Sequence, residues 1–263
     1  ALELARELFV LIEKKCTDEG GYLEAFSREF APVSNEKLSE NGVMAERTMN
    51  TLLHVFEGYA GLYQAANDPQ VAGAMERILD IYAAKIYNPE LHRQEVFFDR
   101  DYNSLIDLTS YGHDIESSWL IDWGTGLLGR AELTKKIAAI DSDLAGHILR
   151  TALQPDGSVV NECERGVVDE HRVWWVQAES VLGFVNAWEK HPERVEFREA
   201  AAWVWQYIQK KIVDSRPGGE WFWRLNSDGT PDREKPTVEP WKCPYHNGRM
   251  CLELIRRDPD VYV

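Results

Sequence analysis

Two histidines and a glutamate stand where acid–base chemistry could take place. His113 and Glu116 lie three residues apart in "SYGHDIESSWL", and His246 lies in "WKCPYHNGRMCLE". Side chains at that spacing share one face of a helix, so Glu116 is expected to hold the His113 imidazole in one tautomer. Both histidines are expected in the first turn of a helix, where the helix dipole favours a neutral ring that can accept a proton. A purely structural role is the alternative for each histidine.

The two imidazoles could flank one carbon atom of a substrate. One would remove a proton and the other would return a proton to the opposite face, as an epimerase or isomerase requires. Pro244 suits the first position of a helix, which is why His246 is expected in a first turn. A glycosidase would instead need two carboxylates on either side of a glycosidic bond.

Other segments carry candidate substrate-binding side chains. Asn50 and His54 lie four residues apart and could bind sugar hydroxyls or an enediolate oxygen, or could be satisfied within a core. Indole rings could stack on the C–H faces of a sugar, although most tryptophans are core residues. The remaining substrate-binding candidates are Trp174, Trp175, Glu179 and Trp241.

The sequence gives no support for a metal or an organic cofactor. His113 and Glu116 resemble one half of a carboxylate metal site, but the second half and any cluster of His and Cys at ligand spacing are missing. No GxGxxG, P-loop or GxSxG motif is present. We therefore expect chemistry by the side chains alone.

Apolar residues recur at helical spacing in eight segments, which predicts an all-α fold. The predicted helices cover 2–16, 44–66, 69–87, 113–129, 132–153, 172–190, 193–213 and 244–257. "EVFFD" and "EWFWRLN" are predicted to form short hairpins within loops. From residue 44 onward, helices joined by short turns form pairs, and a repeat of such pairs predicts a toroid whose first members form an inner ring. The candidate site residues all lie on, or just before, these first members.

Composition limits the class of protein. The 263 residues are 44% apolar and carry a net charge of −15, which argues against nucleic acid and against an anionic membrane surface as partners. The four cysteines fit neither a metal pattern nor a disulfide scaffold, so a reducing, cytoplasmic location is expected. No linker is evident, and we predict one domain over 1–263.

Several motifs together resemble one enzyme family. "SYGHDIESSWL", "RVWWVQAES" and "WKCPYHNGRMCLE", with "ENGVMAERTMNTLLHVFEGY" and "GGEWFWRLN", are similar to the cellobiose 2-epimerase branch of the N-acylglucosamine 2-epimerase superfamily. The resemblance implies an (α/α)6 barrel and cofactor-free epimerisation at C2 of the reducing-end glucose of a β-1,4-linked disaccharide. Cellobiose would become glucosyl-mannose and lactose would become epilactose, through a cis-enediolate. The resemblance also implies that His246 is the base at C2 and that His113 is the conjugate acid.

The predicted helices depart from that family in number. The family barrel has twelve helices and eight are predicted here, so the N-terminal third is expected to be missing. A fragment, a truncated gene product and a chain completed by a partner segment are the three explanations. The rival functions are a monosaccharide 2-epimerase or aldose–ketose isomerase, an inactive sugar-binding fragment, and a glycosidase on the same barrel.

Overall fold

The computed structural model describes residues 1–36 and 41–257, and the chain falls into two compact units. Unit 1 contains residues 1–109 and 120–141, and unit 2 contains residues 110–119 and the chain from 142 onward. Each unit is described by itself below. The expectation of one domain over 1–263 stays a prediction.

The described part of the chain is mostly helical, and each of the eight predicted helices is present within a few residues. The helices are α1 (Leu2–Lys15), α2 (Met49–Ala66), α3 (Pro69–Ile81), α4 (Tyr111–Leu128), α5 (Ala131–Thr151), α6 (Trp174–Lys190), α7 (Val195–Tyr207) and α8 (His246–Arg257). A single π-helical turn follows α3 and another follows α7: η1 (Tyr82–Ile86) and η2 (Ile208–Ile212). Among the described residues, no helix is both long and apolar enough to cross a lipid bilayer.

The strands are very short. They are β1 (Thr17–Asp18), β2 (Gly21–Tyr22), β3 (Arg47–Thr48), β4 (Tyr87–Asn88), β5 (Arg93–Gln94), β6 (Phe97–Phe98), β7 (Leu108–Ser110), β8 (Glu162–Glu164), β9 (Val167–Asp169), β10 (Arg172–Val173) and β11 (Arg224–Leu225). β1–β2, β4–β5 and β8–β9 are local antiparallel hairpins.

Both predicted strands turn back within their own loops, as expected: Phe98 bridges Ser104, and Leu225 bridges Pro231, each pair antiparallel. Both segments also pair with strands that are distant in the sequence. β6, within "EVFFD", pairs with β3, which runs directly into α2. β11, within "EWFWRLN", pairs with β10, which runs directly into α6. Backbone groups of an edge strand need partners, and these segments supply them to the residues just before two helices. Each pairing therefore fixes where a helix begins.

Helix starts in unit 1 follow ordinary capping chemistry. The Thr48 hydroxyl accepts a hydrogen bond from Thr51 N at 3.0 Å, so α2 begins at Met49 and the predicted start at 44 is wrong. Asp68 caps α3, and Pro69 occupies its first position. α2 packs against α3, as the predicted pairing of these helices requires.

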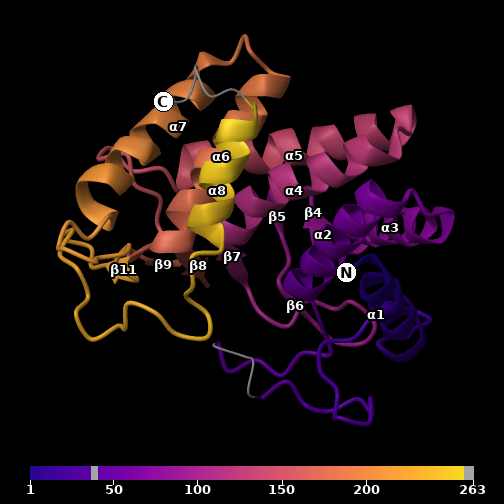
Figure 1. Ribbon diagram of the computed structural model, residues 1–263. Coiled ribbons are helices and arrows are strands. Elements are labelled where there is room, and N and C mark those ends of the chain that lie inside the picture. The colour runs from indigo at the N-terminus through magenta and orange to yellow at the C-terminus, as the bar shows by residue number, and fades with distance from the viewer. Residues whose placement is uncertain (37–40, 258–263) are drawn as a thin grey trace. The chain divides into compact units, whose positions relative to one another are not determined.

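Unit 2 is built around α6, which is buried along most of its length. A helix that is apolar on every side is normally a core helix. α6 packs against both α7 and α8, and in Figure 1 α8 lies beside α6. Gly183 of α6 meets Ile115 of α4 so closely that a Cβ atom on the glycine would lie 2.4 Å from the Ile115 side chain. The first two turns of α4 are thus held against α6, with its polar residues facing the same region.

Candidate active site

His246 is the first residue of α8, so its predicted place in a first turn is confirmed. Pro244 lies two residues ahead of the helix and not at its first position, which corrects the predicted start. Lys242 and Asn247 fix the backbone on both sides of His246, because both side chains donate hydrogen bonds to Glu220. Buried Lys242 also donates to the Thr237 carbonyl at 2.8 Å. The loop before α8 is therefore anchored by an ion pair beneath it.

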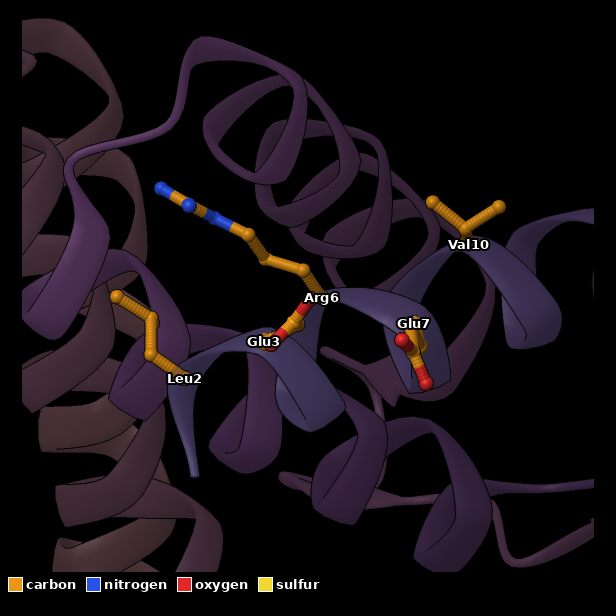
Figure 2. Close-up of a pocket in the computed structure, with 5 residues that line it drawn as sticks. All are labelled: Leu2, Glu3, Arg6, Glu7 and Val10. Carbon is orange, nitrogen blue, oxygen red and sulfur yellow. The ribbon is translucent and has the colours of Figure 1, made fainter.

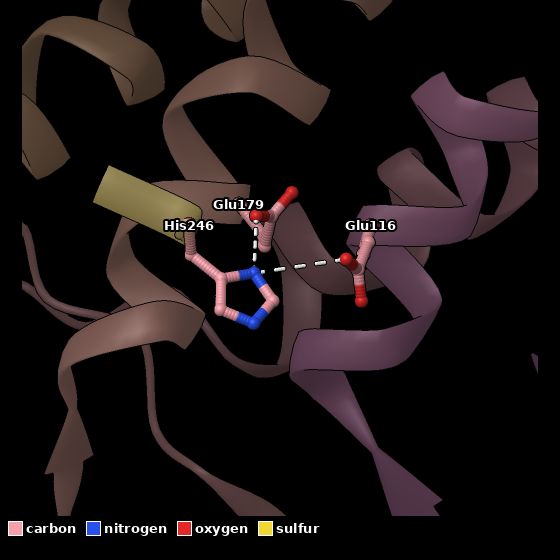
Figure 3. A group of neighbouring side chains, drawn as sticks. All are labelled: Glu116, Glu179 and His246. Atoms are coloured by element: carbon pink, nitrogen blue, oxygen red, sulfur yellow. Dashed lines mark hydrogen bonds and ion pairs between the residues drawn. The ribbon is translucent and has the colours of Figure 1, made fainter. Parts of the chain in front are cut away.

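The imidazole of His246 is held by carboxylates from two other helices. Its Nδ1 lies 2.7 Å from Glu179 Oε1 of α6 and 3.7 Å from Glu116 Oε1 of α4 (Figure 3). Glu179 is 0% and Glu116 1% exposed. An ionised carboxylate can only accept hydrogen bonds, so Nδ1 of a neutral ring carries the proton. The lone pair then belongs to Nε2, which is the tautomer that a general base needs.

Arg249 supplies the positive charge that two buried carboxylates require. Its Nη2 donates to Glu116 Oε1 at 2.5 Å and to Glu179 Oε1 at 2.8 Å. The guanidinium also lies over the rings of Trp119 and Tyr245, 5.0 and 4.6 Å from their centroids. Burial opposes ionisation of Glu179, but the charge of Arg249 and the contact with His246 outweigh it and hold the pKa of Glu179 below its ordinary value.

Glu179 and Trp174, two of the predicted sugar contacts, both contact His246 in this structure. Glu179 accepts from Trp119 Nε1 at 2.8 Å in addition to His246 and Arg249, and it is fully buried. Trp174 is only 1% exposed, and its ring meets His246 edge-on at 5.4 Å between centroids. Both side chains are almost fully buried, and sugar binding by them stays a prediction.

His113 and His246 meet the same indole ring. The Trp175 ring lies 4.8 Å from His113 and 5.4 Å from His246, measured between ring centroids. His113 lies in the first turn of α4, and its Nδ1 is 2.7 Å from the hydroxyl of Ser110, the last residue of β7. The contacts of Glu116 described above are with Arg249 and His246, and the expectation that Glu116 orients His113 stays a prediction.

Gly112 permits this arrangement. A Cβ atom at residue 112 would lie 2.4 Å from Cη2 of Trp175 and 2.7 Å from Val176. With no side chain at this position, the indole can approach the helix backbone. Trp175 can therefore lie against His113.

Three other sequence candidates are described by their own surroundings. Asn50 is exposed and His54 half-buried on α2 of unit 1, where His54 Nδ1 lies 2.9 Å from Glu57 Oε2. Trp241 is 71% exposed in the loop before α8. Sugar binding by these three side chains stays a prediction.

Sequence reasoning missed two side chains that the structure brings into the site. Arg249 follows His246 by three residues, and Trp119 follows Glu116 by three residues. The same helical spacing that paired His113 with Glu116 could have found both. Lys242 gave no such signal, because its partner Glu220 is 22 residues away in the sequence.

The arrangement of Glu116, Glu179 and His246 does not suit a metal ion. Their ligand atoms lie within 4.8 Å of one another, which is close enough for three ligands. The Arg249 guanidinium, however, already binds both carboxylates. A second cation at that point would be repelled by the first and would have to displace it.

A shallow hollow of about 720 Å³ lies on α1, in unit 1. The side chains that line it all project from this one helix: Leu2, Glu3, Arg6, Glu7 and Val10 (Figure 2). It contains none of the acid–base side chains described above, so we assign no chemistry to it.

Comparisons with known proteins give the family. The sequence profile of the N-acylglucosamine 2-epimerase family matches residues 1–247. Cellobiose 2-epimerases from Eubacterium cellulosolvens and Ruminococcus albus are 49% and 46% identical, over 99% of this chain and 68% and 67% of their own lengths. The chain thus spans about two thirds of the length of these relatives.

Solved structures agree with the sequence comparison. A sugar epimerase from a ruminal bacterium superposes with a TM-score of 0.95 at 46% identity, over 98% of this chain and 66% of that one. A cellobiose 2-epimerase from Bacillus thermoamylovorans gives a TM-score of 0.93 at 43% identity, over 97% and 66%. A D-mannose isomerase, at 16% identity and a TM-score of 0.79, shares the fold. The chain belongs to the N-acylglucosamine 2-epimerase family.

Proposed function

We propose that this protein epimerises C2 of the reducing-end glucose in β-1,4-linked disaccharides. Cellobiose would give glucosyl-mannose, and lactose would give epilactose. Relatives with 42–49% identity are named cellobiose 2-epimerases, which supports the substrate class. The acidic chain suits a neutral sugar, which needs no positively charged surface to attract it.

The reaction requires one proton to leave C2 and another to arrive on its opposite face. With the sugar ring open, Nε2 of His246 takes the C2 proton, and the electron pair of the C–H bond moves into a cis-enediolate. The imidazolium of His113, on the opposite face of C2, then returns a proton to C2 while the electron pair moves back and the C1 carbonyl forms again. We propose His246 as the base at C2 and His113 as the conjugate acid, which also assists ring opening. The general acid–base contribution of such a pair is about 10²–10⁴-fold.

One observation carries this proposal: both imidazoles contact the ring of Trp175 while Nδ1 of His246 is held by a buried carboxylate. The first contact keeps the two rings within the reach of one sugar. The second presents Nε2 as the proton acceptor. Two isolated surface histidines would have neither property.

Substrate binding is proposed for aromatic, amide and imidazole side chains from both units. Half-buried Trp175 and exposed Trp241 offer indole faces for stacking on sugar C–H groups. Asn50 and His54 are proposed to bind sugar hydroxyls. Hydrogen bonds to charged or polar partners of this kind contribute about 1 kcal/mol each, so single losses should raise KM more than they lower kcat.

We also propose that a further segment completes an (α/α)6 barrel of twelve helices. The relatives are longer than this chain, and α8 leaves Leu252 and Ile255 69% and 60% exposed. Covering apolar side chains of this size contributes about 1.5–3 kcal/mol each. A larger mass in solution than one chain, with α8 protected from hydrogen exchange, would support a partner segment; a monomer with an unprotected α8 would argue against it.

A substrate panel tests the proposal. The protein is incubated with cellobiose, lactose, glucose, mannose and N-acetylglucosamine, and anomeric proton signals are followed by NMR. We expect new manno signals with the two disaccharides. Conversion of the monosaccharides alone would favour the monosaccharide epimerase or isomerase, release of glucose would show hydrolysis, and binding without conversion would leave an inactive sugar-binding chain.

A further inference from the structure

We propose that Arg249 is a positioning residue that keeps Glu116 and Glu179 ionised side by side, so that Glu179 can fix the tautomer of His246. The kinetic part of this inference rests on the proposed epimerase function. The structural part does not, because the tautomer of His246 can be measured without a substrate.

The contacts of Arg249 join both carboxylates that lie beside Nδ1 of His246. One nitrogen, Nη2, donates to carboxylates of α4 and α6, and it lies 3.4 Å from Nδ1 of His246. Nη1 donates to the Tyr245 hydroxyl at 2.7 Å. The side chain is 12% exposed, so this cation is itself largely removed from water.

Two buried carboxylates at such close range cannot both stay ionised without a counter-charge. Both approach the same guanidinium nitrogen and the same imidazole nitrogen. Without Arg249 they would share one proton, as paired carboxylates in a common site do. A protonated Glu179 would lose acceptor capacity that Trp119 and His246 now use, and it could donate to Nδ1 instead. The imidazole would then be free to place its proton on Nε2, where no base function remains.

The titratable groups around this centre come from three helices and one loop. Glu116 belongs to α4, Glu179 to α6 and His246 to α8, and Tyr245 is the residue directly before α8. His113 of α4 contacts the ring of Trp175, which also contacts His246. Loss of the Arg249 cation removes positive charge from beside the two acids, so proton uptake by the carboxylate pair should extend to higher pH.

Arginine suits this position better than lysine. Its planar group donates in several fixed directions and stacks on aromatic rings, whereas an ammonium is a compact and strongly hydrated charge. The guanidinium lies over both Trp119 and Tyr245 while it binds both carboxylates. We therefore expect Arg249→Lys to restore the charge but only part of the geometry.

The experiment compares four variants: Arg249→Met, Arg249→Lys, the double variant Arg249→Met/Glu116→Gln, and Arg256→Met as the control. Arg256 is another arginine of α8, exposed and paired with Glu253. Far-UV circular dichroism first checks that each variant folds. The rate of C2 exchange with cellobiose is then measured against pH, and ¹⁵N NMR of histidine-labelled protein reports which nitrogen of His246 carries the proton.

We expect Arg249→Met to lower kcat about 100-fold at pH 7, within the usual range for acid–base groups, with KM changed by less than about threefold. Its acid limb should move to higher pH, and Arg249→Lys should recover about tenfold of the rate. The double variant removes one of the two acids, so its acid limb should return toward that of the wild type. His246 should carry its proton on Nδ1 in the wild type and should show both tautomers in Arg249→Met.

Two results would overturn the inference. One is an acid limb that stays in place in Arg249→Met while KM alone rises, which would make Arg249 a sugar-binding residue. The other is a wild-type His246 whose proton lies on Nε2. If the wild type shows no C2 exchange with any sugar, the proposed function fails, but the ¹⁵N measurement still decides the role of Arg249.

Discussion

Replacing Glu179 by Gln tests the link between the buried carboxylate and the base. The substitution keeps the size of the side chain and removes its charge. Glu179 accepts hydrogen bonds from three donors, at 2.7 Å from His246, 2.8 Å from Trp119 and 2.8 Å from Arg249. A neutral amide has one acceptor oxygen and adds a donor, so it cannot serve all three groups.

The loss of activity follows from the tautomer. Where a carboxylate orients a catalytic imidazole in other enzymes, the amide variant lowers kcat by about 10⁴-fold because the ring takes the wrong tautomer. Glu116 Oε1 lies 3.7 Å from the same nitrogen and can replace part of the interaction. We therefore expect a smaller effect, about 10²–10³-fold in kcat, with KM little changed.

The cost in stability follows from the ion pair. Removing one member of a buried pair typically costs about 3–5 kcal/mol, but Arg249 keeps Glu116 as a partner, so we expect about 2–3 kcal/mol. At about 2–4 °C per kcal/mol for a chain of this size, the midpoint of thermal unfolding should fall by about 5–10 °C.

The assay measures C2 exchange at 25 °C, well below that midpoint, with circular dichroism to confirm folding. The matched control is Glu193→Gln, since Glu193 also faces a histidine nitrogen, that of His191 at 3.5 Å, but is 70% exposed. We expect the control to keep its rate and its unfolding midpoint. A Glu179→Gln variant that is folded and retains exchange within about threefold of the wild type would refute the reasoning.

Three further predictions concern the support of the site and its dependence on pH. Gly112→Ala should displace Trp175, lower the stability by about 1–3 kcal/mol and lower kcat. Gly126→Ala in the same helix, where a Cβ meets nothing within 4 Å, should leave kcat unchanged. Equal effects of the two substitutions in steady-state kinetics would count against the role of Trp175. Lys242→Met should lower kcat more than Lys210→Met, because Lys242 anchors the loop before His246 through Glu220. A wild-type rate in Lys242→Met would contradict this role of Lys242. The free energy of unfolding from urea titrations should be constant above about pH 5 and should decrease as the pH falls through the lowered pKa of Glu179. The reason is that the unfolded chain then binds protons that the folded chain does not. If the free energy of unfolding changes with pH in the same way in Glu179→Gln, this carboxylate is not responsible.

The sequence predicted the helices well because their apolar spacing is regular. It located the starts of α2 and α6 less well, since these depend on pairing with β6 and β11, which lie about 50 residues away in the chain. Such contacts between distant segments leave no local pattern. For the same reason, the ion pair by which Lys242 anchors the loop before α8 to Glu220 could not be predicted.

The candidate site was predicted in part. The histidines were found because their surroundings are unusual in type and spacing, and each lies in the first turn of a helix as expected. The partners on other helices were not predicted. Helical spacing predicts that Glu116 serves His113, which stays a prediction, but it could not show that the same carboxylate binds Arg249 and lies near His246, a residue of another helix. Spacing along one helix gives the face that a side chain shares, but the packing of α4 against α6 and α8 decides which group it meets.

Transfer of the C2 proton between the sugar and solvent is the most direct measurement of the central claim. Cellobiose is incubated in deuterium oxide with the wild type and with His246→Gln, and C2 is followed by NMR. We expect deuterium at C2 of both the gluco and the manno sugar with the wild type, and none with the variant, which should still bind cellobiose. A manno product that keeps its original hydrogen at C2, or undiminished exchange in His246→Gln, would rule out proton transfer by His246.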